Sequence, residues 1–250
     1  MWFEAGLLLP VVGEMGKKLS LEEERVRYAG MLEYENQYRG KLIAGMDEAG
    51  RGPLAGPLTI AAVILPEGAF IPGLNDSKKL TAKKRDFLYE EILKVAVAVS
   101  VNIVSVSNID RLNIYQATKQ GMAQCLAHLR PRPEVALVDA MQPEVQGMEV
   151  VPIIHGDALS VSIAAASVVA KVVRDRIMIG LDGLYPQYGF AGHKGYGSVK
   201  HRAALQEQGA CIWHRRSYEP VKSLHLAPVP AEANILYSPL LDREFVYPLK

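Results

Sequence analysis

Two kinds of hydrophobic pattern alternate along the chain. Short runs rich in Val, Ile and Leu that end at Gly, Pro, Asp or Asn are typical of buried strands. Apolar positions three and four residues apart are typical of one face of a helix. The first pattern predicts strands at 41–46, 58–66, 95–106, 135–138 and 149–154. The second predicts helices at 20–38, 81–93, 107–129, 160–178 and 198–208. Successive strands followed by strand–helix alternation indicate an α/β domain, with a central mixed β-sheet flanked by helices.

Side chains that cap helices mark several of these boundaries. Ser20, Thr81 and Ser107 each precede a helical pattern and are predicted N-caps. Gly- and Tyr-rich residues at 185–197 and basic residues at 214–221 indicate loops. The chain therefore divides into a leader with one helix (1–40), a main domain (41–222) and a proline-containing tail (223–250).

Composition excludes several classes of protein. Of 250 residues, 49% are hydrophobic and 22% charged, which is ordinary for a soluble globular protein. The formal net charge of +1 gives no overall nucleic-acid signal, so any basic surface must be local. Cys125 and Cys211 are far apart and look like reduced thiols rather than a disulfide or zinc site. We see no signal peptide or membrane span, because the longest apolar stretch (58–65) is far below the roughly 20 residues required. A cytoplasmic protein is expected.

Carboxylates lie at the ends of the predicted strands. Asp47 and Glu48 follow the first strand, Asp139 ends another, and Asp157 follows a third. Ligands of α/β sheets collect at the carboxyl ends of strands, so these side chains can converge. Adjacent strand residues point to opposite faces, so Asp47 and Glu48 reach one site only if the strand breaks or bulges between them. Gly50 makes such a break plausible.

Clustered carboxylates require a cation, because like charges raise one another's pKa. With no Cys/His cluster in the sequence, oxygen ligands favour Mg²⁺ or Mn²⁺ over zinc. Two such ions about 3.5–4 Å apart would activate water and stabilise the leaving oxygen of a phosphodiester. For any one acid alone, a cap or surface charge is the simpler interpretation. Asp175 is a rival ligand, but an ion pair with Lys171 one helical turn away explains it more simply.

Two loops offer groups for a nucleic-acid backbone. The turn Gly50, Arg51 and Gly52 can bring backbone groups close to a ribose 2′-hydroxyl, and Arg51 can fork a phosphate. The alternative is ordinary turn chemistry with an exposed arginine. The loop before the helix at 81–93 supplies a hydroxyl and two cations: Ser77, Lys78 and Lys79. For that loop, a simple helix-leading turn is the better interpretation on its residues alone.

Residues 171–222 carry a local basic excess. They contain nine Lys or Arg against four acids, interleaved with aromatic residues, a pattern typical of a nucleic-acid track. His193, His201 and His214 add latent charge. Tyr196 stands between glycines and is predicted to contact a sugar or base. For the aromatic residues Tyr185 and Phe190, packing is favoured.

These motifs together resemble type 2 ribonuclease H, the ribonuclease HII family. The resemblance covers roughly residues 41–222 in order. Its motifs are GMDEAGRGPLAGP (45–57), DSKKL (76–80), LVDA (137–140), GD (156–157) with SIAAAS (162–167), YGF (188–190), HKGYG (193–197) and HRRSY (214–218). Two departures are mild: Ala140 where glycine is common in the family, and Tyr218 where phenylalanine is common.

The resemblance implies a ribonuclease H-like fold and a function. It implies hydrolysis of the RNA strand of RNA–DNA hybrids and nicking of duplex DNA 5′ of embedded ribonucleotides, leaving 5′-phosphate and 3′-hydroxyl ends. A monomer acting on these nucleic acids with two Mg²⁺ or Mn²⁺ ions is expected. The acids that match the family's metal-binding catalytic residues are Asp47, Glu48, Asp139 and Asp157. Gly50, Arg51 and Gly52 match the family's motif that reads the 2′-hydroxyl, and Tyr196 matches the tyrosine that senses the RNA–DNA junction. The further predicted substrate-binding residues are Ser77, Lys78, Lys79, His193 and Lys194.

Two other functions stay open at this point. A hybrid-binding protein could keep the fold without the chemistry, although the presence of all four acids argues against it. Another nuclease of the same fold, such as an exonuclease or an integrase-type enzyme, is a closer rival. The Gly-Arg-Gly turn and the segment at 193–197 argue against that class.

Overall fold

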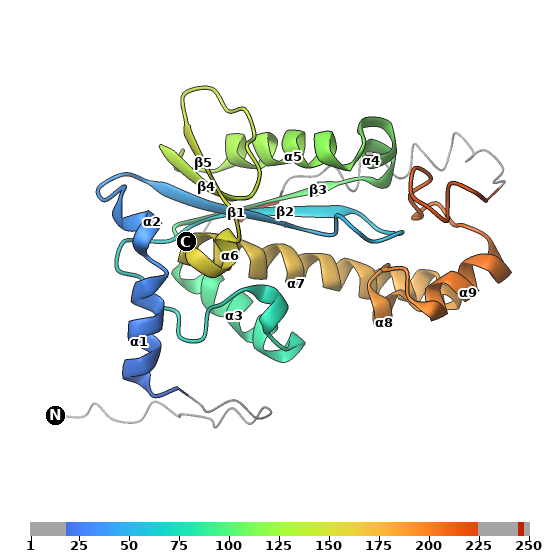
Figure 1. Cartoon of the computed structure of the whole chain (residues 1–250), viewed down its shortest axis with the longest axis horizontal. Helices are drawn as coiled ribbons and strands as arrows, with labels where there is room; N and C mark the ends of the chain where they lie inside the picture. The colour runs from blue at the N-terminus through green and yellow to red at the C-terminus, as the bar shows by residue number, and fades with distance from the viewer. Residues whose placement is uncertain (1–18, 225–244, 248–250) are drawn as a thin grey trace.

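The computed structural model of the chain describes residues 19–224 and 245–247. A central β-sheet is covered on both faces by helices (Figure 1). Helices α4 (Val106–Leu112) and α5 (Ile114–His128) lie on one face; α3 (Ala82–Val95) and α7 (Val161–Leu184) lie on the other. Among the described residues, no helix is long and apolar enough to cross a membrane. The three-layer arrangement confirms the predicted α/β class.

The sheet is mixed, as predicted. Its strand order is β5-β4-β1-β2-β3-β6, with β1 parallel to β4, β4 parallel to β5 and the other pairs antiparallel. In the part of the chain described, the strands are β1 (Ile43–Ala49), β2 (Leu58–Ile64), β3 (Ala98–Val104), β4 (Val135–Asp139), β5 (Glu149–Ile153) and β6 (Phe245–Tyr247). The pairing of β1 with β4 brings two strand ends that carry acids to the same edge of the sheet.

Strand β1 does not break where the sequence suggested. The ladder with β2 continues without interruption through Asp47↔Ala61, Glu48↔Ile60 and Ala49↔Thr59. The prediction of a break or bulge between Asp47 and Glu48 is therefore wrong. Backbone pairing along the whole neighbouring strand outweighs the local preference of the glycines that follow, and the turn begins only at Gly50, whose φ is +103°.

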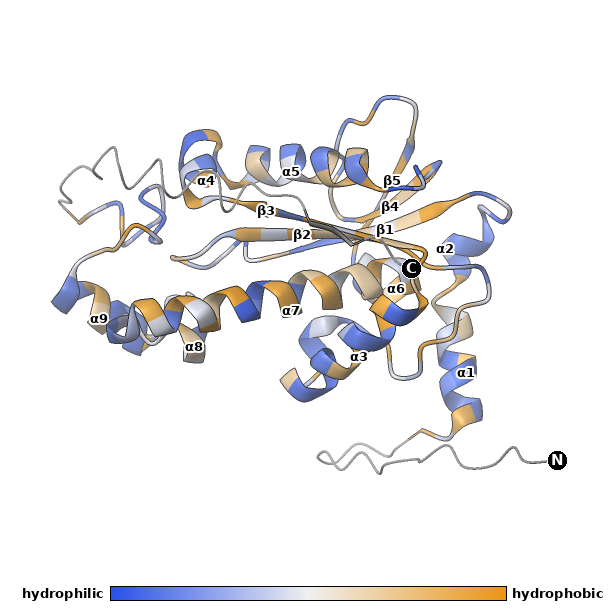
Figure 2. Cartoon of the chain, turned by 180° about the vertical axis from the view of Figure 1, so that it is seen from behind, coloured by the Kyte–Doolittle hydropathy of each residue, from blue (hydrophilic) through white to orange (hydrophobic). Residues whose placement is uncertain are grey.

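Helix α7 packs closely on β1, and small residues make this possible. A Cβ on Gly45 of β1 would overlap the backbone of Ser162 in the first turn of α7. Ser160 caps the helix by accepting a hydrogen bond from the Ile163 N–H (3.2 Å). The helix begins where predicted and runs six residues beyond the predicted end at 178, to Leu184. Figure 2 shows mixed apolar and polar positions along α7 and a more hydrophilic α1.

Two predicted helices are each divided in two. The helix expected at 20–38 forms α1 (Leu21–Gly30) and α2 (Glu33–Asn36), although the Ser20 cap is confirmed by a capping box with Glu23. The helix expected at 107–129 forms α4 and α5, and its cap is Ser105 rather than Ser107. Asn113 divides it, because its positive φ (+66°) ends α4 while its side chain accepts a hydrogen bond from Gln116 N–H (3.1 Å) to cap α5.

The remaining elements are short and lie around the ends of α7. They are the 3₁₀ turns η1 (Ser77–Lys79) and η2 (Pro186–Tyr188) and the helices α6 (Gly156–Leu159), α8 (Phe190–His193) and α9 (Val199–Gln208). The predicted loop at 185–197 thus contains η2 and α8. Of the expected leader and tail, residues 1–18, 225–244 and 248–250 lie outside the described residues. Residues 245–247 of that tail form β6 at the edge of the sheet.

Candidate active site

Three aspartates from separate parts of the chain meet at one edge of the sheet. Asp47 lies near the end of β1, Asp139 ends β4, and Asp157 is in α6. One carboxylate oxygen from each lies within 4.8 Å of the others. The convergence follows from the fold, because β1 and β4 are parallel neighbours and α6 follows β5 at the same edge. The strand-end argument therefore located all three acids.

This triad is electrostatically unfavourable without a cation. Asp47 is buried at 5% exposure, and its burial, followed by the charges of Glu48 and Asp139, raises its pKa well above the usual range. Burial also raises the pKa of Asp139, against the opposing effect of a hydrogen bond from Gly156 N–H to Asp139 Oδ1 (2.8 Å). Both shifts oppose the charged forms of Asp47 and Asp139, as expected of carboxylates brought together without a cation.

Glu48 lies beside the triad rather than in it. Asp47, Asp139 and Asp157 form the grouped ligand atoms, whereas Glu48 pairs with Arg51 (Oε1···Nη1 3.5 Å). Burial raises the pKa of Glu48 to about 7, although Arg51 opposes the shift. Glu48 Oε2 is buried and has no hydrogen-bond partner among the described residues. An unpartnered buried carboxylate oxygen next to three more carboxylates is chemically suited to a metal.

The donor set fits a hard divalent cation. All the grouped ligand atoms are carboxylate oxygens, which suit Mg²⁺ or Mn²⁺, and a cation would relieve both the mutual repulsion and the unpartnered Glu48 oxygen. Lys78 supplies some positive charge, since its Nζ lies 3.1 Å from Asp157 Oδ2, but the lysine itself is mostly exposed. The rival ligand Asp175 lies outside the group and pairs with Lys171 (2.7 Å), as predicted.

A buried arginine holds the turn that follows β1. Arg174 of α7 is 1% exposed, and its guanidinium donates to three backbone carbonyls: Pro57 (3.0 Å), Lys194 (2.9 Å) and Ala55 (3.2 Å). Gly50 lies against it, so that a Cβ there would overlap Arg174 Nε. Burial, with the nearby Arg215 charge, lowers the pKa of Arg174 to about 10, which leaves it protonated at neutral pH.

A second buried arginine holds the same turn from the other side. Arg215 donates to the carbonyls of Gly50 (2.6 Å), Arg51 (2.9 Å) and Gly56 (2.9 Å). The Tyr218 hydroxyl also donates to the Arg51 carbonyl (2.7 Å). The guanidinium groups donate and the backbone carbonyls accept, so the two arginines fix the backbone of the turn at 50–57. The N–H groups of Leu54 and Gly56 are also engaged, by the carbonyls of Gly195 and Trp213, so the accessible part of the turn is Arg51 and Gly52.

Tyr196 stands beside this turn and is accessible. Its ring is 46% exposed, and a Cβ on Gly52 would lie 3.8 Å from Tyr196 Cε1. The exposure agrees with the predicted contact role, whereas Tyr185 and Phe190 pack into a hydrophobic cluster, as favoured. His193, a predicted substrate contact, is half-buried, and both of its ring nitrogens are hydrogen-bonded to backbone groups. Its Nε2 bonds the Tyr188 carbonyl (2.8 Å), and its Nδ1 accepts from Gly195 N–H (3.2 Å).

The other predicted substrate contacts divide between exposed and enclosed groups. Lys78 and Lys79 of η1 are exposed, and Lys78 reaches the acidic triad through Asp157. Ser77 is only 5% exposed, so its hydroxyl is not presented to a large ligand. The Lys194 ammonium bonds the Ala191 carbonyl within its own loop. Gly50 and Ser77 are buried, while Arg51 and Gly52 are more accessible.

The sequence pattern missed the structural arginines. Arg174 and Arg215 were counted in the basic track at 171–222, yet both are buried and serve the turn at 50–57. The position of each arginine in the sequence was the signal that could have identified it. Arg174 follows an apolar helical face, and Arg215 lies in a motif that resembles one of the ribonuclease HII family. The exposed basic track is correspondingly smaller than the count suggested.

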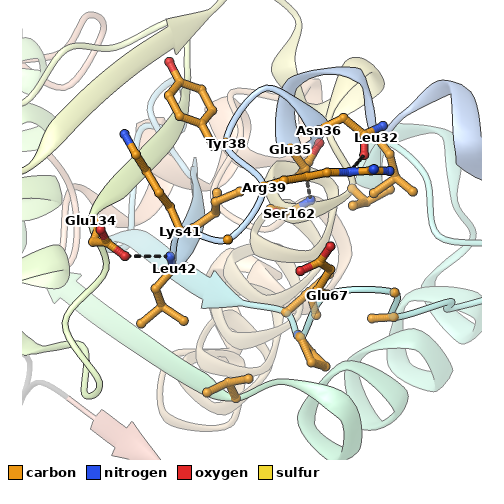
Figure 3. A pocket seen from close by; sticks show the side chains of 18 of the residues that line it. Leu32, Glu35, Asn36, Tyr38, Arg39, Lys41, Leu42, Glu67, Glu134 and Ser162 are labelled. Atoms are coloured by element: carbon orange, nitrogen blue, oxygen red, sulfur yellow. Dashed lines mark hydrogen bonds between the residues drawn. The ribbon is translucent and has the colours of Figure 1, made fainter.

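A cavity lies on another part of the molecule. It has a volume of about 510 Å³ and is walled by α1, α2, the start of β1 and the turn after β2 (Figure 3). Glu35 forms part of its wall and accepts hydrogen bonds from Ser160 Oγ (2.6 Å) and Ser162 N–H (3.0 Å). The three grouped aspartates and the predicted substrate-binding residues do not line it. Glu35 thus connects α2 to the first turn of α7, away from the acidic triad.

The chain is similar to known proteins over most of its length. A family model described as Ribonuclease HII matches residues 44–221. The chain is 50% identical over 206 residues to a ribonuclease HII from Bacillus mycoides (strain KBAB4), covering 81% of this chain and 80% of the relative. It is 53% identical over 201 residues to a ribonuclease HII from Geobacillus thermodenitrificans (strain NG80-2), covering 79% and 77%.

Solved structures are similar as well. A crystal structure of ribonuclease H2 from Pyrococcus horikoshii OT3 superposes with a TM-score of 0.65 at 27% identity, covering 72% of this chain and 95% of that one. RNase HII from Archaeoglobus fulgidus, solved in a complex with PCNA, superposes with a TM-score of 0.62 at 30% identity, covering 75% and 98%. The predicted ribonuclease H-like fold is confirmed, and the chain belongs to the ribonuclease HII family of type 2 ribonuclease H enzymes.

Proposed function

We propose that this chain is an endonuclease that hydrolyses the RNA strand of RNA–DNA hybrids and nicks duplex DNA on the 5′ side of an embedded ribonucleotide. Products would carry 5′-phosphate and 3′-hydroxyl ends. The observation that carries the proposal is the triad of the buried Asp47 and Asp157 and the half-buried Asp139, whose ligand oxygens lie within 4.8 Å of one another, next to the glycine-arginine-glycine turn that follows β1. Cleavage and sugar recognition are then adjacent in the chain and in space.

The acids would hold two Mg²⁺ or Mn²⁺ ions. Asp47, Asp139 and Asp157 supply the grouped oxygens, and Glu48 supplies the unpartnered Oε2 next to them. When bound, the ions would supply an activated water and neutralise charge on the leaving oxygen. The protein's own part is to orient the carboxylates; Asp139 is oriented by Gly156 N–H, and Asp47 by the Glu48 N–H (2.7 Å).

The turn at 50–57 would inspect the sugar. Arg215 engages the Gly50 and Arg51 carbonyls and so fixes this turn, and its accessible residues Arg51 and Gly52 would meet a 2′-hydroxyl, with the buried Gly50 shaping the turn behind them. The exposed ring of Tyr196 beside Gly52 would stack against the same nucleotide. Lys78 and Lys79 would contact backbone phosphates. For the buried Ser77, and for the half-buried His193 and Lys194 with their hydrogen bonds inside the loop, support of these loops is favoured over direct contact.

The test is a cleavage assay on matched duplexes. One 5′-labelled duplex contains a single ribonucleotide, a second is a full RNA–DNA hybrid, and a third is all DNA. We expect nicking 5′ of the ribonucleotide and cleavage of the hybrid with Mg²⁺ or Mn²⁺, no cleavage after chelation, and none of the all-DNA control. Failure to cut either ribose-containing substrate with either ion would refute the proposal. Tight binding of the hybrid without product would instead support a non-catalytic binding protein.

We also propose that the enzyme acts as a monomer in the cytoplasm. Cys125 and Cys211 are not joined in a disulfide, and Cys125 is buried, which is compatible with a reducing compartment. Sedimentation at micromolar concentration, with and without a ribonucleotide-containing duplex, tests the monomer. A dimer in either condition would contradict it.

A further inference from the structure

Three histidines pack together directly behind the Tyr196 loop. His201 of α9 and His214 are 0% and 1% exposed, and His193 stacks on His201 with ring centroids 4.3 Å apart. The Phe190 ring packs edge-on against His201 (5.5 Å). Buried imidazoles need defined hydrogen-bond partners, so the bonds of each ring determine which nitrogen carries the proton.

The bonds around His201 and His214 have only one consistent direction. His201 Nδ1 lies 2.9 Å from the Tyr196 carbonyl, which can only accept, so Nδ1 carries the proton and Nε2 accepts. His201 Nε2 lies 3.0 Å from His214 Nε2, which must therefore donate. His214 Nδ1 is then an acceptor, and the Cys211 N–H donates to it (3.0 Å). The result is a chain of neutral rings, called here the imidazole relay, from Cys211 N–H to the Tyr196 carbonyl.

The relay joins segments that also hold the turn at 50–57. Leu54 N–H donates to the Gly195 carbonyl (2.8 Å), and Gly56 N–H donates to the Trp213 carbonyl (2.8 Å). The Cys211 thiol (Sγ···His214 Nδ1 3.2 Å) and the Tyr188 ring (centroid 4.8 Å from that of His214) also face the relay. The Tyr196 carbonyl is thus held by His201, while the Tyr196 side chain remains exposed.

We propose that His201 and His214 are positioning residues that hold Tyr196 beside Gly52 for contact with the nucleotide. The inference rests on the proposed function, since it requires Tyr196 to contact the substrate. Neither histidine touches the substrate in this proposal. Each acts through the Tyr196 carbonyl, and reversing either ring would set two donors or two acceptors against each other.

Two substitutions of His201 separate the relay bonds. The amide nitrogen of asparagine lies near the Nδ1 position, so His201→Asn keeps the donor to Tyr196. The longer glutamine places its amide near Nε2, so His201→Gln loses that donor. We expect His201→Gln to lower kcat/KM on the single-ribonucleotide duplex roughly five- to tenfold, the value of one hydrogen bond, and His201→Asn to lose distinctly less. His128→Gln, on the exposed end of α5, is the matched control and should change kcat/KM less than twofold.

A double-mutant cycle with Tyr196→Ala tests whether the effect passes through Tyr196. If it does, His201→Gln added to Tyr196→Ala should lower kcat/KM less than twofold further. Full additivity, or equal losses for the Asn and Gln variants, would overturn the proposal. Thermal unfolding of each variant checks that it is folded.

The wild-type protein gives a second readout that does not depend on cleavage. Imidazole ¹⁵N shifts near pH 7 should show the proton on Nδ1 of His201 and on Nε2 of His214. The opposite tautomer, or a charged ring, at either residue would overturn the relay. If the wild type does not cleave, the proposed function fails, and the tautomer measurement still decides the relay.

Discussion

The acidic triad and the supporting region behind the turn at 50–57, made of Arg174, Arg215 and the imidazole relay, bury polar groups in opposite ways. In the triad, like charges are gathered and their pKa values rise, and Glu48 Oε2 has no hydrogen-bond partner in the described chain. Behind the turn, Arg174 donates to carbonyls, His201 donates to the Tyr196 carbonyl, and His214 donates to the His201 ring. The first region is incomplete without a cation, whereas the second is complete as folded.

The two regions also respond oppositely to pH. The folded pKa of Asp47 is raised, so the stability it contributes is present below its unfolded pKa and is lost as the pH rises through its folded pKa. The folded pKa of His214 is lowered, so the stability it contributes is present above its unfolded pKa and is lost as the pH falls. As far as these two groups determine it, the metal-free protein should therefore be most stable between the unfolded pKa of Asp47 and the unfolded pKa of His214. Near neutral pH, the triad thus lowers the stability of the metal-free protein, whereas the stabilising contribution of His214 behind the turn is present.

The largest effect is expected from Asp139→Asn. Loss of even an outer-shell partner typically costs 10–100-fold in metal affinity or activity, so loss of a ligand should lower activity by more than about 100-fold. In the metal-free protein the same change removes one of the repelling charges and should raise the free energy of unfolding at pH 7 by about 1 kcal/mol. Single-turnover cleavage and denaturant unfolding with chelator measure the two effects.

Full activity of Asp139→Asn would refute the catalytic role of the triad. A fall in metal-free stability would show instead that the carboxylate mainly serves its bond to Gly156 N–H. Addition of Mg²⁺ should raise the melting temperature of the wild type and leave that of Asp139→Asn nearly unchanged.

The next largest effect is expected from Gly50→Ala, which breaks the supporting region. A residue with a Cβ is strained at φ +103°, and its Cβ would overlap Arg174 Nε. We expect a loss of about 3 kcal/mol in the free energy of unfolding, with reduced cleavage. The control is Gly180→Ala on the exposed side of α7, where nothing lies within 4 Å. It should be stabilising by about 0.5–1 kcal/mol. Similar losses at both positions would show that Arg174 does not hold the turn.

Near pH 6, a smaller effect is expected from the titration of His214. Burial, followed by the nearby His201, lowers its pKa to about 3, against an unfolded value near 6.5. The unfolded chain gains a proton below pH 6.5 and the folded protein does not, so stability falls between pH 6.5 and 3 by up to about 1.4 kcal/mol per pH unit. His214→Asn should flatten this dependence in chemical unfolding series. Parallel curves for both proteins would show that His214 does not titrate differently on folding.

The position of the triad could be predicted from the sequence, whereas the burial of the arginines that hold the turn at 50–57 could not, and each outcome has a physical reason. Parallel strands end at one edge, so strand-end acids such as Asp139 can be placed without coordinates. Burial of Arg174 cannot be read in this way, because a charge count does not distinguish a solvated guanidinium from one that bonds carbonyls of a distant turn. Likewise, the unbroken β1 depends on pairing with β2, and the division at Asn113 on a single left-handed residue. Local patterns predicted elements well and long-range hydrogen bonds poorly.

The smallest effect is expected from Tyr218→Phe, which changes the residue to the one common in the family. The Tyr218 hydroxyl donates to the Arg51 carbonyl (2.7 Å) and accepts from Arg215 Nη1 (3.3 Å). The variant retains the ring and both arginine bonds to Gly50 and Arg51, so the turn should keep its conformation. We expect a loss of about 1 kcal/mol in the free energy of unfolding and less than a threefold change in cleavage. A large loss of cleavage with unchanged stability would mean that the hydroxyl, rather than the arginines, sets the orientation of the turn.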